Sequence, residues 1–241
     1  MKRNLPALLV LILFGCADVV NGQAINDPAR IEIYVTPYYN SEGPTINVGP
    51  FSKGLGANSE REFVGTIAKM KQSWNNLSFP EMYVGAIRLY DRGFRKGSIY
   101  WFYSAQYQGR LVATLLDREK MGSIGSPGFE LAQASNAFQQ LVGPYINRYG
   151  FGDIDQLLLI IERVQKERKV IPDLNKIYPG VSFKDKSDWE TGNKELNAGL
   201  STLVETLKAQ KASIKQQRID NGVEAKFSKL TAKELPKESR Q

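Results

Sequence analysis

From Ser78 to Gly109 the chain reads SFPEMYVGAIRLYDRGFRKGSIYWFYSAQYQG, and this stretch decides the fold. Ser78-x-x-Glu81 is a capping box that starts a helix, and Pro80 falls in the first turn, where proline is tolerated. Gly93 is placed to end that helix in the left-handed conformation. A second helix follows with apolar residues on most of its sides, which predicts a helical hairpin packed within a mainly α-helical bundle.

The hairpin also carries two motifs, Ala86-x-x-Leu89-Tyr90-x-x-Gly93 and Trp101-Phe102-x-x-Ala105-x-x-Gln108-Gly109. Over residues 86–109 these motifs resemble one unit of a Sel1-type repeat, a relative of the tetratricopeptide helix pair. The resemblance implies two closely packed helices with aromatic side chains between neighbouring units. A repeat unit buries its face only against stacked neighbours, and no second copy follows. The resemblance therefore implies a helix-pair geometry without establishing a solenoid.

The first 22 residues have the pattern of a targeting signal, with two basic residues before a short apolar core. That core is too short to remain in a bilayer as a spanning helix. Two processing routes fit the pattern. Cleavage after Gly22 would leave Gln23 first, whereas Leu13-Phe14-Gly15-Cys16 resembles a bacterial lipobox, a signal that ends before Cys16 and makes this cysteine the lipid-bearing N-terminus.

Cys16 is the single cysteine of the chain, and histidine is absent. The domain behind the signal therefore has no internal disulfide and depends on its hydrophobic core. Export without disulfides favours the bacterial periplasm, with membrane attachment if Cys16 is lipidated. Histidine and paired thiols are the usual means of activating a nucleophile and of binding zinc. We therefore expect no catalytic residue, no metal site and no cofactor.

The formal net charge is +7, and much of it lies near the end of the chain. From Lys208 to Gln241 there are nine Lys and Arg residues against four Asp and Glu residues, a difference of +5. Residues 221–241 are expected to form a loosely ordered basic tail, with contact to anionic lipid or an acidic partner as the alternative. Because the chain is predicted to be exported, we expect no nucleic-acid partner.

Residues 23–220 are expected to form one mostly helical domain. Near its start, Ile31, Ile33 and Val35 alternate with polar residues, which is strand periodicity. Turn residues follow, and the alternation then resumes. We therefore predict a short β-hairpin at residues 31–49, laid on the helical body, because two strands alone are marginally stable.

Three further helices are predicted after the hairpin. One covers Phe129 to Val142 and ends at Gly143-Pro144. Another contains Leu157–Ile161, which is apolar all round and predicts a central, buried helix. The longest starts at the capping box of Ser187 and ends at Asn221-Gly222. Its leucines form a heptad-like seam, which docks either on the body of the protein or on a second subunit.

The second helix of the hairpin is the predicted contact surface. Its aromatic residues are too many for all to pack on one side, and Tyr and Arg are enriched among the residues that dominate binding energy at protein interfaces. The predicted binding residues are Tyr100, Tyr103, Gln106, Tyr107 and Arg110. The alternative is that the tyrosines pack under the N-terminal β-hairpin and only their hydroxyl groups reach water.

These features predict a non-enzymatic, exported protein-binding module of the bacterial envelope. In gross character the chain is similar to Sel1-repeat lipoproteins that act as immunity factors, so an immunity or adaptor protein is the expected form, with an envelope or secreted protein as its partner. The alternative is a periplasmic solute-binding protein with a pocket lined by tyrosine and arginine. A third reading is a hydrolase that works without histidine, through a Ser-Lys or carboxylate pair.

Overall fold

The computed structural model of the protein describes residues 25–33, 38, 46–236 and 239. Its centre is a helical hairpin made of α4 (Phe79–Asp91) and α5 (Arg95–Leu115). The predicted capping box starts α4, because the carboxylate of Glu81 accepts the backbone N–H of Ser78 at 2.7 Å. Gly93 joins the two helices with a φ of +86°, as predicted. The regular elements of the described residues are helices, which confirms the predicted mainly α fold.

The two helices of the hairpin approach closely because a glycine faces an indole ring. A Cβ atom at Gly85 of α4 would lie 2.6 Å from the ring of Trp101 in α5, which is closer than van der Waals contact allows. Trp101, Tyr83 and Phe102 are almost completely buried around this contact. Packing of large rings over a small residue therefore holds the hairpin together.

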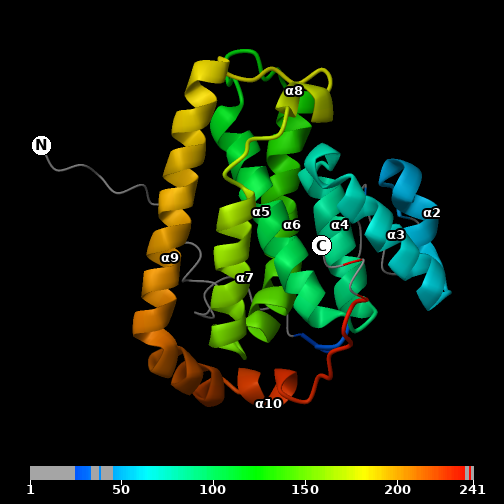
Figure 1. Ribbon diagram of the computed structural model, residues 1–241, viewed down its shortest axis with the longest axis vertical. Coiled ribbons are helices and arrows are strands. Elements are labelled where there is room, and N and C mark those ends of the chain that lie inside the picture. Colours follow the sequence, from blue (N-terminus) through cyan, green and yellow to red (C-terminus); the bar gives the residue numbers. More distant parts are fainter. Residues whose placement is uncertain (1–24, 34–37, 39–45, 237–238, 240–241) are drawn as a thin grey trace, which may run out of the picture.

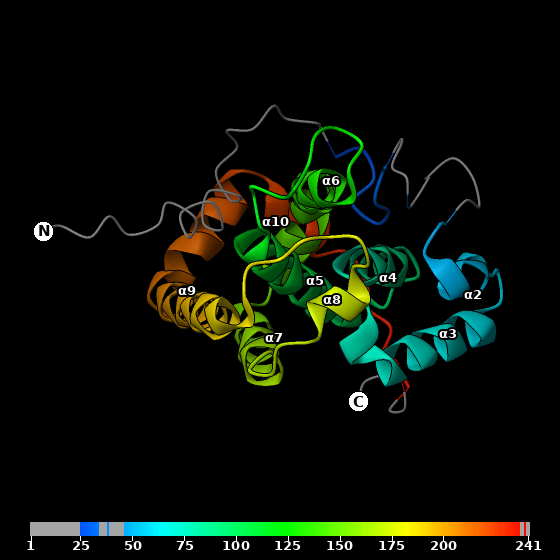
Figure 2. The same ribbon diagram turned by 90° about the horizontal axis from the view of Figure 1, so that it is seen from above.

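The other helices of the described residues pack around the hairpin (Figures 1 and 2). Viewed from above, α5 lies at the centre and is ringed by α4, α6, α7 and α9 (Figure 2). The bounds of the remaining elements are η1 Gly49–Phe51, α2 Ser52–Gly56, α3 Glu60–Gln72, η2 Trp74–Asn76, α6 Pro127–Gly150, α7 Ile154–Glu167, α8 Leu174–Ile177, α9 Lys186–Asp220 and α10 Val223–Phe227. No helix in the described part of the chain is long and apolar enough to cross a bilayer.

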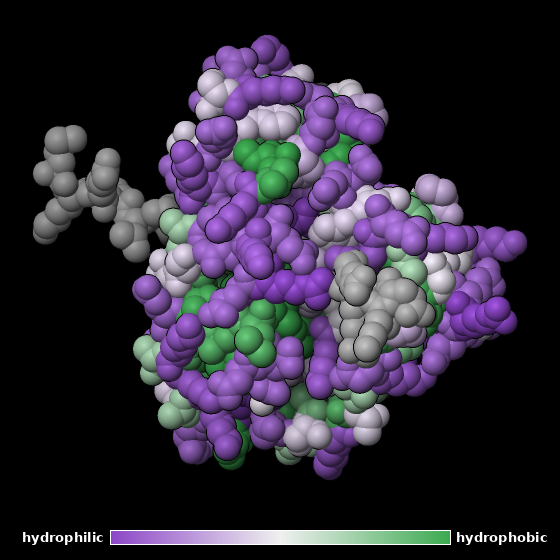
Figure 3. All heavy atoms as spheres, viewed as in Figure 1, coloured by the Kyte–Doolittle hydropathy of each residue, from purple (hydrophilic) through white to green (hydrophobic). Residues whose placement is uncertain are grey.

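Three local predictions are corrected by the structure. Helix α6 does not end at Pro144 but runs through it, because Ile146 beyond the proline is fully buried and holds the last turns against the core. Helix α7 is not buried all round, since Leu159 is 63% exposed and apolar side chains gather on the surface over α7 (Figure 3). Helix α9 begins at Lys186, with Asp185 as its N-cap, instead of at Ser187.

The leucine seam of α9 docks on the body of the same chain, which was one of the two predicted alternatives. Leu203, Leu207 and Ile214 are buried where α9 packs on α5 and α7. The β-hairpin predicted for residues 31–49 falls largely on residues 34–37 and 39–45, which lie outside the described residues. The targeting segment and Cys16 lie outside them as well.

The tail was expected to be loosely ordered, and its described part is instead attached to the hairpin. Phe227 in α10 and Leu235 beyond it are both buried. The backbone N–H of Lys233 donates to the carbonyl oxygen of Gly93 at 2.8 Å. Leu235 packs directly against Gly97, where the absence of a side chain leaves room for it. Two apolar side chains thus hold a segment in which Lys, Arg, Asp and Glu make up eight of 21 residues.

Candidate functional site

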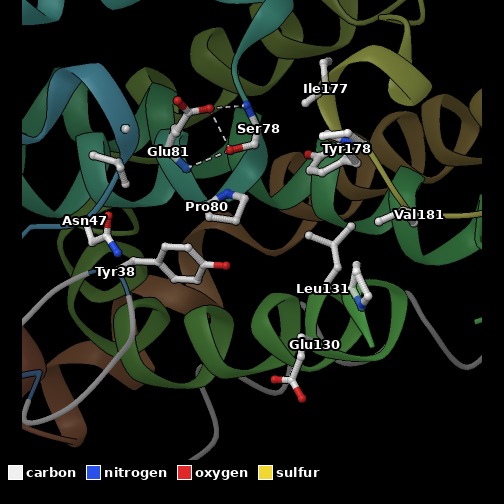
Figure 4. A pocket seen from close by; sticks show the side chains of 14 residues that line it. Tyr38, Asn47, Ser78, Pro80, Glu81, Glu130, Leu131, Ile177, Tyr178 and Val181 are labelled. Atoms are coloured by element: carbon white, nitrogen blue, oxygen red, sulfur yellow. Dashed lines mark hydrogen bonds between the residues drawn. The ribbon is translucent and has the colours of Figure 1, made fainter. Parts of the chain in front are cut away.

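A pocket of about 400 Å³ opens where the first turns of α4 and α6 meet the end of α8 (Figure 4). This volume lies in the range of small-molecule sites. Aromatic, proline and aliphatic side chains form much of the wall, together with a few polar groups. The lining residues are Tyr38, Asn47, Val48, Gly49, Ser78, Pro80, Glu81, Pro127, Glu130, Leu131, Ile177, Tyr178, Pro179 and Val181.

The capped first turns of α4 and α6 form two walls of the pocket. Ser78 caps α4 and places Pro80 and Glu81 in its first turn at the edge of the pocket. Ser126 caps α6 in the same way, with its side chain accepting the N–H of Phe129 at 3.4 Å. Both helices therefore point their N-terminal ends toward the pocket, and each end carries a partial positive charge of roughly +0.5.

Tyr178 forms a rigid third wall. Its hydroxyl oxygen accepts the backbone N–H of Phe79 at 2.9 Å and the side-chain N–H of Gln108 at 3.1 Å. Burial raises the pKa of Tyr178, so the phenol stays protonated at neutral pH. A ring held at its hydroxyl end in this way presents a fixed face to a ligand (Figure 4).

The pocket has a negative balance of charge although the protein as a whole is basic. Its lining includes two carboxylates, Glu81 and the rim residue Glu130, and no Lys or Arg side chain. Burial and the nearby charge of Glu130 raise the pKa of Tyr38. The two helix ends offset about half of the two negative charges. The site therefore favours a ligand that carries positive charge or donates hydrogen bonds.

The binding residues predicted from sequence do not line this pocket. Tyr100, Tyr103 and Tyr107 are buried to 94% or more, and Gln106 and Arg110 are half-buried. The expectation of an exposed tyrosine surface was wrong, because the three tyrosines lie on faces of α5 that neighbouring helices cover. The alternative was right that the tyrosines are buried, but helices α6, α7 and α9 provide partners for their hydroxyl groups, and the predicted β-hairpin lies largely outside the described residues.

Each of the three tyrosine hydroxyl groups is hydrogen-bonded inside the protein, to a different neighbour. Tyr103 donates to the side-chain oxygen of Asn147 at 3.0 Å. Tyr107 donates to the side-chain oxygen of Asn193 at 2.7 Å. Tyr100 donates to a carboxylate oxygen of Glu167. The three therefore belong to three separate contacts between helices and form no common site.

The pocket residues were missed by sequence reasoning because they come from five separated stretches of the chain. One signal was available: both Ser78 and Ser126 are followed by a proline in the first helical turn and by a glutamate within four residues. This pattern marks two helix starts with similar chemistry. That the two starts lie side by side follows only from the packing of α6 on α4.

The described residues contain no group of three His, Cys, Asp or Glu side chains arranged to hold a metal ion. No family model matches the chain, and no solved structure matches it. The chain is similar to an uncharacterized protein of Haemophilus influenzae, with 26% identity over 171 residues, which cover 68% of this chain and 61% of the relative. The match thus spans about three fifths of that relative's length, and the resemblance to a Sel1-type repeat stays a prediction.

Proposed function

We propose that this protein is a non-enzymatic binding protein for a small solute that carries an ammonium group beside an apolar body. The observation that carries the proposal is the pocket at the starts of α4 and α6, with two tyrosine rings, two carboxylates and no basic side chain in its lining. Aromatic faces and carboxylates are the groups that proteins use to bind ammonium ions. The predicted envelope location is part of the proposal.

A solute is better supported than a protein partner. The protein-binding hypothesis depended on tyrosines of α5 that would project from the surface, and these side chains are buried. The solute-binding alternative asked for a pocket lined by tyrosine, which Tyr38 and Tyr178 provide. Its predicted arginine, Arg110, is not part of this lining. The proposed ligand is accordingly a cation and not an anion.

Glu81 is the residue proposed to attract the ammonium group. The capping box uses one of its carboxylate oxygens, Oε2, for the N–H and hydroxyl of Ser78. No described residue is seen to donate to the other oxygen, Oε1, and we propose that a hydrogen-bond donor of the ligand uses it. A cation–π contact contributes about 0.5 to 2 kcal/mol and an exposed ion pair about 0.2 to 1 kcal/mol. With apolar contacts added, we expect dissociation constants from the micromolar to the millimolar range.

Three probes of one shape and different charge test the proposal. We would titrate the purified full chain with benzylamine, benzyl alcohol and benzoate in a calorimeter. Benzylamine should bind tightest and benzoate weakest. In Glu81→Gln the preference for benzylamine over benzyl alcohol should fall about fivefold, because the charge is lost while glutamine still completes a capping box.

Glu62→Gln is the matched control. Glu62 follows the N-cap Ser59 of α3 at the same position as Glu81 in α4, but it is exposed and lies outside the pocket. This variant should keep the preference of the unmodified protein. Tighter binding of benzoate than of benzylamine, or an equal effect of the two substitutions, would show that the proposed ligand class is wrong.

A further inference from the structure

One polar group in the wall of the pocket holds a proton that has no acceptor. The hydroxyl oxygen of Tyr178 accepts two hydrogen bonds, from the backbone N–H of Phe79 at 2.9 Å and from the side chain of Gln108 at 3.1 Å. A phenol hydroxyl can accept in this way and still has one O–H to donate. No residue in the described ranges accepts that proton, although the Tyr178 side chain is 94% buried.

The side chain of Gln108 cannot turn around to accept the proton. Its Nε2 group also donates to the carbonyl oxygen of Leu77 at 2.7 Å, and its Oε1 atom accepts an N–H of Arg168 at 3.1 Å. A flipped amide would set Oε1 against a carbonyl oxygen and the amide N–H groups against a guanidinium group, which only donates. Arg168 is buried and lies outside the pocket lining, and it acts as a positioning residue that fixes the orientation of Gln108.

The neighbouring wall, the first turn of α4, has its own donors already in use. The N–H of Phe79 is bonded to Tyr178, and Pro80 has no N–H. The N–H of Glu81 donates to the hydroxyl oxygen of Ser78 at 3.4 Å. The N–H of Ser78 donates in turn to the Glu81 carboxylate. The hydroxyl group of Tyr178 is therefore the donor that this side of the pocket supplies to a ligand.

This hydroxyl group lies close to the carboxylate of Glu81. The hydroxyl oxygen is bonded to the backbone N–H of Phe79, and Oε2 of Glu81 is bonded to the N–H of the preceding residue at 2.7 Å. Consecutive Cα atoms are about 3.8 Å apart, so the two groups lie within roughly 9 Å of each other. Burial raises the pKa of Tyr178, and the charge of Glu81 raises it further, as expected for neighbours. In Figure 4 the hydroxyl end of Tyr178 points toward Ser78 and Glu81.

We infer that the solute bound in this pocket carries a neutral oxygen acceptor, such as an ether, hydroxyl or amide oxygen, within a few bonds of its ammonium group. The inference rests on the proposed function and narrows it to one class of amine. The ammonium group binds Glu81, and the oxygen accepts the proton of Tyr178. A carboxylate is disfavoured as the acceptor, because the lining holds two carboxylates and no basic side chain. An amine with a hydrocarbon body would leave the buried donor unpaired, which weakens binding.

Two amines that differ in one group test the inference. Aminoethyl benzyl ether and phenylbutylamine, each with its amino group at the end of the chain, have the same charge, ring and length. The first has an ether oxygen where the second has a methylene group. Calorimetric titration of the full chain with each amine gives the ratio of their dissociation constants. The ether should bind the unmodified protein at least as tightly as the hydrocarbon amine, because its oxygen pairs with the donor. In Tyr178→Phe the ratio should shift about fivefold toward the hydrocarbon amine, because the donor is lost while the ring remains.

Tyr107→Phe is the matched control. It also removes a buried hydroxyl group that is hydrogen-bonded inside the protein, to Asn193 at 2.7 Å and Asn197 at 2.6 Å. Tyr107 lies outside the pocket lining, so this variant should keep the ratio of the unmodified protein. Circular dichroism of each variant verifies that it is folded.

The outcomes separate this inference from the proposed function. If neither amine binds, the proposed function is wrong and the inference fails with it. If both bind and their ratio is the same in the unmodified protein and in Tyr178→Phe, the oxygen does not contact the hydroxyl group, and the inference alone is overturned. An ether that binds the unmodified protein more than about fivefold weaker than the hydrocarbon amine would overturn it too, and this comparison needs no variant.

Discussion

Replacing Lys71 with methionine should stabilise the folded protein at pH 7. The pKa of Lys71 falls from 10.5 to about 8, chiefly because of burial. At pH values where the side chain is charged in both the folded and the unfolded state, this lowering corresponds to roughly 3 kcal/mol of lost stability. Methionine has a similar length and needs no counter-charge, so most of that cost disappears.

Three favourable contacts are lost with the ammonium group. These are the hydrogen bond to the Tyr100 hydroxyl and the cation–π contacts with the rings of Trp74 and Tyr100, which together contribute about 2 kcal/mol. The difference leaves a net stabilisation on the order of 1 kcal/mol. For a protein of this size that change raises the melting temperature by about 2 to 4 °C.

The pH dependence gives the stronger test. Below pH 8 Lys71 is protonated in both states, and the cost of its charge is constant. Between pH 8 and 10.5 the folded state releases its proton while the unfolded state keeps it, so the stability of the unmodified protein rises with pH. Lys71→Met lacks this rise, and its advantage should shrink between pH 7 and 9.5.

Urea unfolding of both proteins at pH 7 and 9.5, followed by circular dichroism, measures this difference. Comparing the two proteins at each pH cancels the contributions of the tyrosines, which both share. A Lys71→Met protein that is less stable at pH 7 by more than 1 kcal/mol would refute the reasoning, because the ammonium group would then be well compensated in the fold. An advantage that does not change with pH would refute it too.

Gly85→Ala should destabilise the protein by about 1 to 3 kcal/mol in the same urea assay, because the new Cβ would overlap the Trp101 ring. Gly65→Ala should instead stabilise it by about 0.5 to 1 kcal/mol, because Gly65 lies inside α3 and no other atom lies within 4 Å of the new Cβ. Leu235→Ala should cost about 2 kcal/mol and make the tail more sensitive to limited proteolysis, because this buried side chain anchors the tail. Above pH 10 the free energy of unfolding should fall, because burial raises the pKa of several tyrosines and the unfolded chain therefore loses their protons first. Ultraviolet absorbance at 295 nm should show phenolate appearing together with unfolding.

Local signals predicted the centre of the fold well. The capping box at Ser78 and the left-handed Gly93 correctly marked the start of α4 and its end, and the ring-rich segment after them became α5. Predictions that needed knowledge of distant contacts failed. Pro144 should end a helix by its local chemistry, but burial of Ile146 outweighs the lost backbone hydrogen bond.

The candidate pocket could not be predicted, for the same reason. Glu81 was recognised as a capping residue, but its place in the pocket lining depends on the start of α6 packing beside the start of α4. Around Tyr100, the pair of Arg163 and Glu167 is readable from its spacing of four residues on one helix. Lys71 lies almost a hundred residues earlier, and only the tertiary packing brings it within reach of Tyr100 and its neighbours.

The density of aromatic rings in α5 already indicated that its tyrosines are buried. A helix with apolar residues on most sides must be covered on most sides, so the same pattern that places α5 at the centre removes Tyr103 and Tyr107 from the surface. Their hydroxyl groups then require partners inside the protein, and the structure supplies amide oxygens for both. Tyr100 differs because its partners are ionised. A core that accepts Lys71 and Glu167 at that hydroxyl bears a desolvation cost that packing alone does not require.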